Sequence, residues 1–418
     1  MMLVRLLLAA VLWLPLTTAA AAVAAAPVTP DAQSRAPAPI VVLLSWDGMR
    51  HDFPDLADFP ALQRLETEGV RARRLTPVFP SNTFPGHISL ATGTYPDVHG
   101  IVDNVFLDRE KGRYSYSADA DWIEAEPLWI AAERQGVPTA TYFWVGSETD
   151  WRGQGTRYRE APFDRNRPES AKVDRILEWL SLPEAEKPRL IMSYWSGADH
   201  VGHDDGPGSR HLVQEIRDQD AELGRLLAGI DALGLWPRTT LLLVSDHGMA
   251  AVTRYLNLQA AFDDAGIDAA VVGSAVAEIH LLTPVDDEAV RRTLNDFLKD
   301  VPGSAFYKRE DLPDDFRLRR PNRVGDWVAV LSPPYAFSGA ESMLRRIAIF
   351  LGKEYGMHGY DPTLPDMGGV FFAMGRGVPP DLRLDDVRQI DIAATAAALL
   401  GVEPPAQSEG RPILPAVE

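Results

Sequence analysis

Five runs of consecutive apolar residues are spaced along the chain, and each ends in a polar or glycine-rich turn. These runs are rich in Val, Ile, Leu and Phe, and they cover residues 39–48, 137–146, 189–199, 239–248 and 368–375. A run that is apolar at nearly every position indicates a strand covered on both faces, as in a parallel sheet.

Between these runs, apolar residues recur at helical spacing. The clearest helix is expected over 209–234, where the periodic positions are Leu212, Ile216, Leu223, Leu226, Leu227 and Ile230. Others are expected over 127–136 and over 391–401, where Asp391 serves as N-cap and Gly401 as the stop. Strand and helix alternate, which predicts an α/β fold, doubly wound around a mostly parallel central sheet.

The pattern changes within residues 251–365. The segments "AEIHLLTP" and "DWVAVLSPP" indicate shorter strands, and "DDEAVRRTLNDFLKDV" indicates a helix. We therefore expect a smaller α/β subdomain at 251–365, inserted into a core formed by 39–250 and 366–418.

The N-terminus has the pattern of a signal peptide, for which we expect residues 1–24. One Arg precedes a short apolar stretch, and small residues follow. The stretch is short for a membrane span, although an uncleaved anchor is the alternative. Residues 25–38, rich in Pro and Ala, predict a flexible lead-in. A periplasmic or secreted protein without a membrane anchor after signal cleavage is expected.

Composition narrows the function classes. The 418 residues are 46% hydrophobic and 24% charged, as in a soluble globular protein, and contain no Cys for disulfides or a lipoprotein anchor. The formal net charge of −18 argues against a nucleic-acid duplex as partner, because duplex binding needs clustered Lys and Arg. A small phosphate-bearing ligand stays compatible with this charge, because metal ions supply local positive charge.

Acidic residues end three of the predicted strands: Asp47, Asp199 and Asp246. A single Asp there is more typical of a cap or turn. Three of them point to the crevice beyond the carboxyl ends of the strands, where α/β sheets bind ligands.

Imidazoles accompany these acids. His203 follows Asp199 by four residues, His247 directly follows Asp246, and glycines flank the segment around His358 in "GMHGYD". Carboxylate and imidazole without thiol suit zinc or a similar divalent ion. The remaining histidines are expected to be structural or solvated: His51, His87, His99, His200, His211 and His280.

Thr83 is the candidate nucleophile. In "PVFPSNTFPGH" a turn enters a short helix near this residue, so its hydroxyl lies in a positive field among free N–H groups that favour phosphate. A plain N-cap is the commoner role of such a Thr, but the nearby acids and imidazoles favour catalysis.

Together these motifs resemble the alkaline phosphatase superfamily. They occur in its order: Asp47 in "SWDG", Thr83 in "PSNTFPGH", Asn104 in "GIVDNVF", Asp199 and His203 in "DHVGH", then "SDHGM" and "MHGYD". Within it, the chain is similar to the nucleotide pyrophosphatase/phosphodiesterase family over roughly 40 to 375. The segment "YFWVGSE" also resembles that family, although Val145 stands where the family has Pro.

The resemblance implies two zinc ions per subunit. One would be bound by Asp199, His203 and His358. The other would be bound by Asp47, Asp246 and His247, and would also touch the hydroxyl of Thr83. Coordination would stabilise a Thr83 alkoxide, and two zincs about 4 Å apart would clamp the attacking and leaving oxygens. Asn104 and the Thr83 N–H would hold a non-bridging phosphate oxygen.

The neighbourhood of Thr83 favours a diester over a monoester. A monoester dianion needs an Arg near the nucleophile, whereas the residues here are Ser81, Asn82, Phe84, Pro85 and Gly86. A sulfatase is excluded, because it needs an oxidisable Cys or Ser and a basic residue four places on, where this chain has Thr83 and His87. The resemblance implies that Phe84 and Tyr194 sandwich a nucleobase. A core strand aromatic is the alternative for Tyr194.

Three functions are weighed. The first is an exported two-zinc phosphodiesterase and nucleotide pyrophosphatase that releases nucleoside monophosphates through a phosphothreonine intermediate. The second keeps the fold and mechanism but acts on lipid-headgroup diesters resembling glycerophosphocholine, or on phosphonates. The third is a catalytically inactive metal-binding recognition protein. The sequence leaves open the natural substrate, the metal in each position, the signal cleavage site and the oligomeric state.

Overall fold

The computed structural model describes residues 37–339 and 343–414. The predicted signal peptide, 1–24, and nearly all of the lead-in lie outside the described residues. From Ala38 onward the chain forms one compact unit. Within the described ranges, no helix combines the length and the apolarity that crossing a membrane requires.

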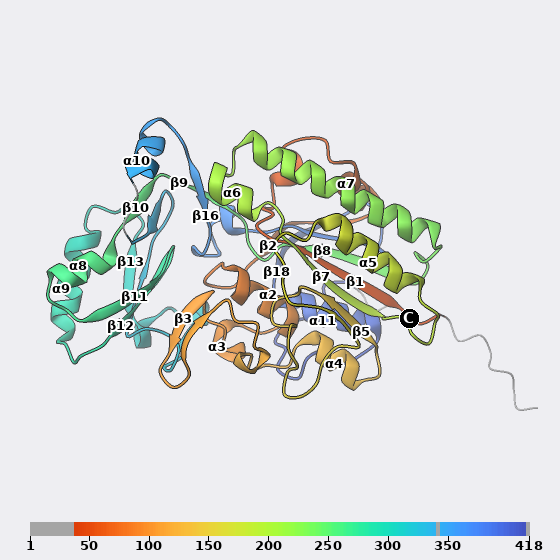
Figure 1. Cartoon of the computed structure of the whole chain (residues 1–418), viewed down its shortest axis with the longest axis horizontal. Coiled ribbons are helices and arrows are strands. Elements are labelled where there is room, and N and C mark those ends of the chain that lie inside the picture. The colour runs from red at the N-terminus through yellow and green to blue at the C-terminus, as the bar shows by residue number, and fades with distance from the viewer. Residues whose placement is uncertain (1–36, 340–342, 415–418) are drawn as a thin grey trace, which may run out of the picture. The chain divides into compact units, whose positions relative to one another are not determined.

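An eight-stranded sheet forms the centre of the fold (Figure 1). Its strands, in spatial order, are β18 (Leu382–Arg388), β2 (Gly69–Thr76), β17 (Phe371–Gly375), β8 (Thr239–Val244), β1 (Ile40–Trp46), β7 (Leu190–Trp195), β5 (Thr139–Tyr142) and β6 (Tyr158–Glu160). All pairs are parallel except those of β17, which is antiparallel to both β8 and β2. The predicted mostly parallel α/β fold is confirmed, with one reversed strand.

Helices cover both faces of this sheet, as the alternation along β1 shows. Val41 and Leu43 belong to one buried cluster, together with α2 (Thr83–Thr92), α4 (Leu128–Arg134) and α11 (Asp391–Leu400). Val42 and Leu44 belong to another, together with α1 (Pro60–Thr67), α5 (Glu169–Ser181) and α7 (Arg210–Ala232). Successive strand residues point to opposite faces, so an uninterrupted apolar run serves two cores at once.

One helix boundary differs from expectation. Asp391 was predicted as the N-cap of a helix, but it is the first residue of α11 and the N-cap is Ile390. The Asp391 carboxylate instead accepts hydrogen bonds from the Arg388 guanidinium and from the N–H of Arg411. A neighbouring arginine and a backbone N–H twenty residues later therefore bind the carboxylate that the local sequence assigned to capping.

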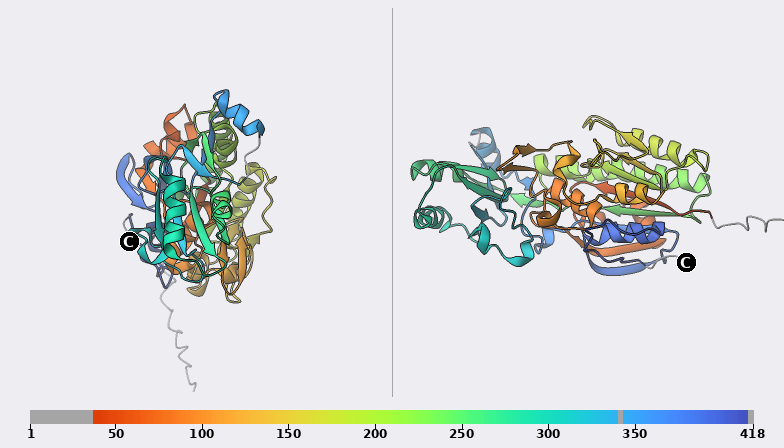
Figure 2. Two further views of the ribbon diagram at one scale, coloured as in Figure 1. Left: turned by 90° about the vertical axis from the view of Figure 1, so that its left-hand side faces the viewer. Right: turned by 90° about the horizontal axis from the view of Figure 1, so that it is seen from below.

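A second sheet lies within residues 251–365. Its order is β11 (Ala269–Gly273), β12 (Val276–Leu281), β14 (Trp327–Val330) and β13 (Ala305–Lys308), and every pair is antiparallel. The helices α8 (Leu258–Asp264) and α9 (Asp287–Leu298) pack on it around a core of their own (Figures 1 and 2). The boundaries of the inserted subdomain stay a prediction.

Arg323 connects this segment to loops of the core. Its side chain is 2% exposed and lies 2.9 Å from the Asp108 carboxylate and 2.7 Å from that of Glu124. It also donates to the carbonyl oxygens of Gly100 and Trp122. One buried guanidinium therefore contacts Gly100 and Asp108, which lie on either side of Asn104 in the chain.

We predict that Arg323→Met lowers the free energy of unfolding by about 3–5 kcal/mol, because the buried Asp108 carboxylate loses its cation. Arg292 on α9 is the matched control. Its side chain is 64% exposed and 3.9 Å from Glu288, so Arg292→Met should change stability by no more than about 0.5 kcal/mol. Urea denaturation measures both. Equal midpoints for the two variants would contradict the role assigned to Arg323.

Candidate active site and metal centre

The predicted strand-end acids lie at one edge of the central sheet. Asp47 directly follows β1, and one residue, Ser245, separates Asp246 from the end of β8. Asp199 begins helix α6 (Asp199–Asp205), which comes shortly after β7. Strands β8, β1 and β7 are neighbours and run parallel, so their carboxyl ends meet. This places the three carboxylates together.

His358 reaches the same place through a short strand pair. Strand β16 (Tyr355–Met357) is antiparallel to β9 (Ala250–Val252), and β9 begins shortly after His247. The pairing brings the loop after β16 to the loop after β8. As a result the His247 and His358 rings stack, with centroids 3.6 Å apart.

Asp47, Asp246 and His247 form one candidate metal-binding group. Nε2 of His247 is 3.3 Å from Oδ1 of Asp47 and 3.2 Å from Oδ2 of Asp246. One ligand atom from each of the three residues lies within 4.8 Å of the others. All three residues are buried, so a cation here would be shielded from solvent.

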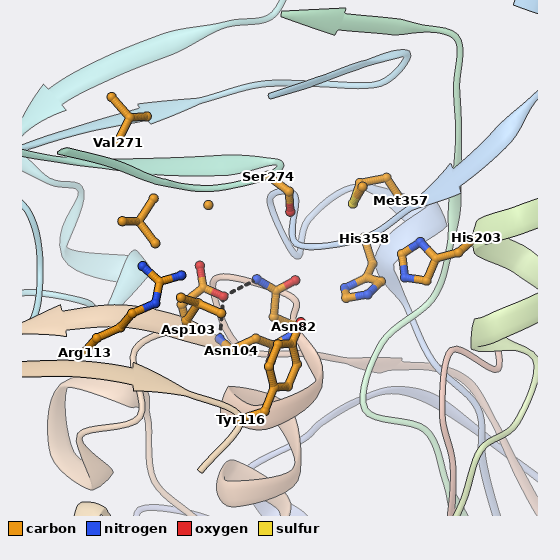
Figure 3. Close-up of a pocket in the computed structure, with 13 residues that line it drawn as sticks. Asn82, Asp103, Asn104, Arg113, Tyr116, His203, Val271, Ser274, Met357 and His358 are labelled. Atoms are coloured by element: carbon orange, nitrogen blue, oxygen red, sulfur yellow. Dashed lines mark hydrogen bonds between the residues drawn. The ribbon is translucent and has the colours of Figure 1, made fainter. Parts of the chain in front are cut away.

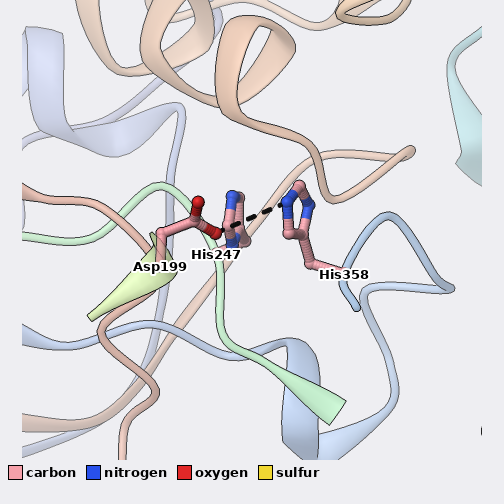
Figure 4. A group of neighbouring side chains, drawn as sticks. All are labelled: Asp199, His247 and His358. Atoms are coloured by element: carbon pink, nitrogen blue, oxygen red, sulfur yellow. Dashed lines mark ion pairs between the residues drawn. The ribbon is translucent and has the colours of Figure 1, made fainter. Parts of the chain in front are cut away.

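The second group differs slightly from the predicted set. Atoms of Asp199, His247 and His358 lie within 4.8 Å of one another (Figure 4). His203 lies beside this group, with Nε2 3.3 Å from Oδ1 of Asp199, and Nε2 of His358 is 3.6 Å from the same oxygen. All six predicted ligands therefore converge, and His247 is the residue that the two groups share.

The hydrogen bonding of these residues fits divalent cations. Three buried carboxylate oxygens in the cluster accept no hydrogen bond: Asp47 Oδ1, Asp199 Oδ1 and Asp246 Oδ2. The imidazoles are held through Nδ1, which lies 2.8 Å from the Gly248 carbonyl in His247, 2.9 Å from Gly356 O in His203 and 3.1 Å from Ser81 O in His358. Nδ1–H donation leaves Nε2 as a lone-pair donor, which is the arrangement of metal-bound histidines.

The electrostatics also favour added positive charge. Burial raises the pKa of Asp47 well above its usual range, and the carboxylates of Asp246 and Asp199 raise it further. Burial lowers the pKa of His358 well below its usual range, and repulsion by His247 adds to this. The packing therefore disfavours an ionised Asp47 unless a cation is nearby.

Thr83 lies at the N-terminus of α2, and its Oγ1 is 3.2 Å from Nε2 of His247. Asn82 occupies the N-cap position but makes no side-chain cap bond. Instead, Oδ1 of Asn104 accepts from the Phe84 N–H at 2.7 Å. Among the described residues, no group accepts from the N–H of Thr83. The helix is thus capped from a distant loop, and an N–H donor remains beside the hydroxyl.

Asp103 was missed from the sequence. Its Oδ1 accepts from Asn82 Nδ2 at 2.7 Å and from the Asn104 N–H at 2.6 Å (Figure 3). Burial, followed by repulsion from Glu278, raises its pKa to about 7. Asp103 therefore ties together the residues that flank Thr83 in space. Its position before Asn104 was its only signal in the sequence, and an Asp in a loop is usually a turn residue.

Two aromatic rings have contacts that the sequence did not indicate. The hydroxyl of Tyr194 donates to Oδ2 of Asp47 at 2.7 Å, which orients a candidate metal ligand. His87 is fully buried; its Nδ1 lies 2.8 Å from the Thr83 carbonyl oxygen and 3.3 Å from Oδ2 of Asp246. Residues outside the candidate ligand set thus support both the cluster and the nucleophile.

A doubly wound α/β sheet with this centre at the carboxyl ends of its strands defines a class of protein, the phosphoester hydrolases with the alkaline-phosphatase-like fold. The family model described as type I phosphodiesterase/nucleotide pyrophosphatase matches residues 41–361. The chain belongs to this family, which confirms the resemblance drawn from its motifs.

Among curated relatives, an uncharacterized pyrophosphatase/phosphodiesterase of Schizosaccharomyces pombe is 32% identical over 352 residues, covering 80% of this chain and 71% of that protein. A venom phosphodiesterase of Naja atra is 29% identical, covering 87% of this chain and 44% of that protein. Mouse ectonucleotide pyrophosphatase/phosphodiesterase family member 1 is 28% identical, with coverages of 90% and 42%. The chain therefore spans less than half of the last two.

Among solved structures, murine ectonucleotide pyrophosphatase/phosphodiesterase 5 superposes with a TM-score of 0.79 at 26% identity, covering 88% of this chain and 96% of that one. That structure is an inactive threonine-to-alanine variant in complex with AMP. The similarity extends over almost the whole of that chain.

We predict that zinc stabilises the metal-stripped protein and that this response needs the cluster. Zinc at a hundredfold excess over Kd should add about 2.7 kcal/mol per independent site. Asp47→Asn should remove much of the response, yet it should raise the melting temperature of the metal-free protein, because it removes a charge that the packing disfavours.

The control is Asp204→Asn, since the Asp204 side chain is 68% exposed and outside the cluster. This variant should respond to zinc as the wild type does. Thermal unfolding with and without zinc measures the stabilisation of each variant, and mass spectrometry measures its metal content. A wild-type melting temperature that zinc leaves unchanged contradicts the assignment.

Proposed function

We propose that the chain is an exported two-zinc phosphodiesterase and nucleotide pyrophosphatase that releases nucleoside monophosphates through a phosphothreonine intermediate on Thr83. The observation that carries the proposal is the position of Thr83 Oγ1, at a helix N-terminus and 3.2 Å from His247 within a buried cluster of unpartnered carboxylate oxygens. Membership of the family supports the reaction class.

The proposed ligands are divided between two ions. Asp199, His203 and His358 hold one, and Asp47, Asp246 and His247 hold the other, next to the hydroxyl of Thr83. Bound divalent cations supply the positive charge that favours the alkoxide of Thr83 and the departing oxygen. The converging donors support this division, although His247 lies close to both groups.

In the proposed reaction, Oγ1 of Thr83 forms a bond to phosphorus as the bond from phosphorus to the leaving oxygen breaks. The N–H of Thr83 and the NH₂ group of Asn104 donate to a non-bridging oxygen of the phosphoryl group. Asn104 suits this role because its carbonyl oxygen is committed to the Phe84 N–H, so its NH₂ group is the part that donates. One of its two N–H groups can reach the substrate while the other bonds to the Tyr116 hydroxyl. Water then cleaves the phosphothreonine and regenerates the hydroxyl.

The nucleoside is proposed to lie between Phe84 and Tyr194. Phe84 packs edge-on against Tyr116, with ring centroids 5.3 Å apart, and the Tyr194 ring is fixed by its bond to Asp47. Fixed aromatic faces stack on any base, so several nucleotides should be accepted. AMP in the related structure supports a nucleotide ligand. Export is proposed from the pattern of residues 1–24, and the venom and ectonucleotide relatives support it.

We predict that Thr83→Ala lowers kcat on the nitrophenyl ester of a nucleoside monophosphate by at least about 10³-fold, because the nucleophile is lost. Zinc content and AMP binding should persist, and Thr83→Ser should keep part of the activity. Thr67→Ala is the control, because Thr67 is an exposed helical Thr bonded to Gln63. A Thr83→Ala variant as active as the control would contradict covalent catalysis. A zinc-loaded wild type without activity would favour the recognition protein.

We also predict that Asp103 positions Asn82 and Asn104. Asp103→Ala should lower kcat by about 10- to 100-fold with less effect on KM, because it loosens groups that act in the transition state. Asp103→Asn should recover part of the rate, since its amide oxygen still accepts hydrogen bonds.

The matched control is Asp220→Ala. Asp220, on α7, is also buried and accepts two N–H bonds, from Ala61 at 3.1 Å and Leu62 at 2.8 Å. These donors are at the start of α1, away from the candidate active site. This substitution should lower stability without changing kcat of the folded enzyme. Stability and steady-state kinetics are measured together for all variants. The prediction is wrong if Asp103→Ala reduces kcat no more than Asp220→Ala does.

A further inference from the structure

A cavity of about 440 Å³ adjoins the candidate active site (Figure 3). His203 and His358 line it at one end, next to the proposed metal centre. Asn104, the hairpin that follows it in the chain and the turn between β11 and β12 form other parts of its wall, so loops of the core and the second sheet both contribute to it. Neither Phe84 nor Tyr194 lines it. Tyr116, which packs against Phe84, does line it, so the cavity lies next to the proposed position of the nucleobase and has other walls.

A phosphate diester carries two substituents, and the proposed function places only one of them. In an in-line displacement the leaving group departs opposite the attacking oxygen. Thr83 does not line the cavity, whereas Asn104, which is proposed to hold a non-bridging oxygen, does. A phosphorus atom between Thr83 and His203 would direct its leaving group toward this space.

Arg113 is the cation in the lining of this cavity. It belongs to β4 (Gly112–Ser115), which pairs with β3 (Val105–Asp108). Within the described part of the chain, its guanidinium makes no hydrogen bond or ion pair with the protein. Arg109 on the same hairpin, by contrast, is paired with Asp326 at 2.7 Å. An unpaired Arg in a chain of net charge −18 is available to bind an anion.

The hairpin that carries Arg113 is packed against the core through its neighbouring residue. The next residue, Tyr114, is buried and stacks on Phe106 with ring centroids 4.5 Å apart. Arg113 points to the opposite face of the strand, because side chains alternate. Asp103 also lines the cavity, but its Oδ1 already accepts from Asn82 and Asn104. Ser274, on the facing turn, adds a hydroxyl.

We propose that this cavity is the leaving-group subsite and that Arg113 binds a phosphate of an anionic leaving group. Among the nucleotides of the proposed function, a nucleoside triphosphate would use this subsite: Thr83 forms its bond to the α-phosphorus, the phosphoanhydride bond breaks, and pyrophosphate departs into the cavity toward Arg113. Guanidinium groups bind phosphate through two parallel hydrogen bonds. A cationic choline would instead face Arg113, which disfavours the lipid-headgroup alternative.

This inference rests on the proposed function, and its test uses two substrates that share one nucleotide. Adenosine triphosphate releases pyrophosphate, whereas the nitrophenyl ester of AMP carries no charge on its leaving group before cleavage. For zinc-loaded Arg113→Gln we expect kcat/KM to fall by roughly 10-fold on the triphosphate and by less than about 2-fold on the ester. Arg113→Lys should lie between, since it keeps the charge but not the fork.

Arg292→Gln is the control, because it removes an exposed charge on α9 and should change neither rate. Added salt should weaken turnover of the triphosphate by the wild type more than by Arg113→Gln. Equal losses on both substrates, no loss, or a wild-type preference for glycerophosphocholine would overturn the subsite. A zinc-loaded wild type that cleaves neither nucleotide would overturn the proposed function itself, and the subsite with it.

Discussion

The structure depends on three carboxylates, those of Asp47, Asp199 and Asp246, held together at a sheet edge and each with an oxygen that accepts no hydrogen bond. Such an arrangement is unfavourable by itself, since buried like charges repel and buried oxygens need partners. It persists because strands β8, β1 and β7 are packed between two apolar cores. Because these neighbouring strands are parallel, the acids that follow them lie at the same edge of the sheet. The stability of the central sheet thus holds together a group of acids that favours added positive charge.

Much of this architecture follows from local sequence. Strands buried on both faces appear in the sequence as uninterrupted apolar runs, so an acid at the end of such a run is easy to recognise. Carboxylates next to imidazoles, without thiols, then limit the candidate ligands to zinc or a similar divalent ion. The strands that the apolar runs did not indicate include β2 and β18, near one edge of the sheet, where Arg74 on β2 pairs with Asp386 on β18. The antiparallel direction of β17 was also out of reach, because an apolar run has no polarity of its own.

The supporting residues could not be found in this way, because their roles come from distant partners. Asp103 resembles any loop acid until Asn82 folds against it, and His87 resembles a helix histidine until Ser45 and Asp246 surround it. Arg113 resembles a solvated charge on a hairpin until the β11–β12 turn is seen to line the same cavity. Candidate ligands are recognised by residue type, whereas positioning groups are recognised only by geometry.

Strand β16 connects the candidate metal-binding cluster to the segment that also carries the second sheet. A Cβ atom on Gly356 would lie 2.3 Å from the carbonyl oxygen of Gly202, so only glycine lets β16 approach α6 this closely. That approach gives His203 its bond to Gly356 and brings His358 beside it. The segment that supplies one wall of the cavity is thus fixed directly to the candidate ligands. Asp47, Asp246 and His247 instead follow core strands, so sequence changes on the β11–β12 turn can alter the proposed leaving-group subsite without touching these three residues.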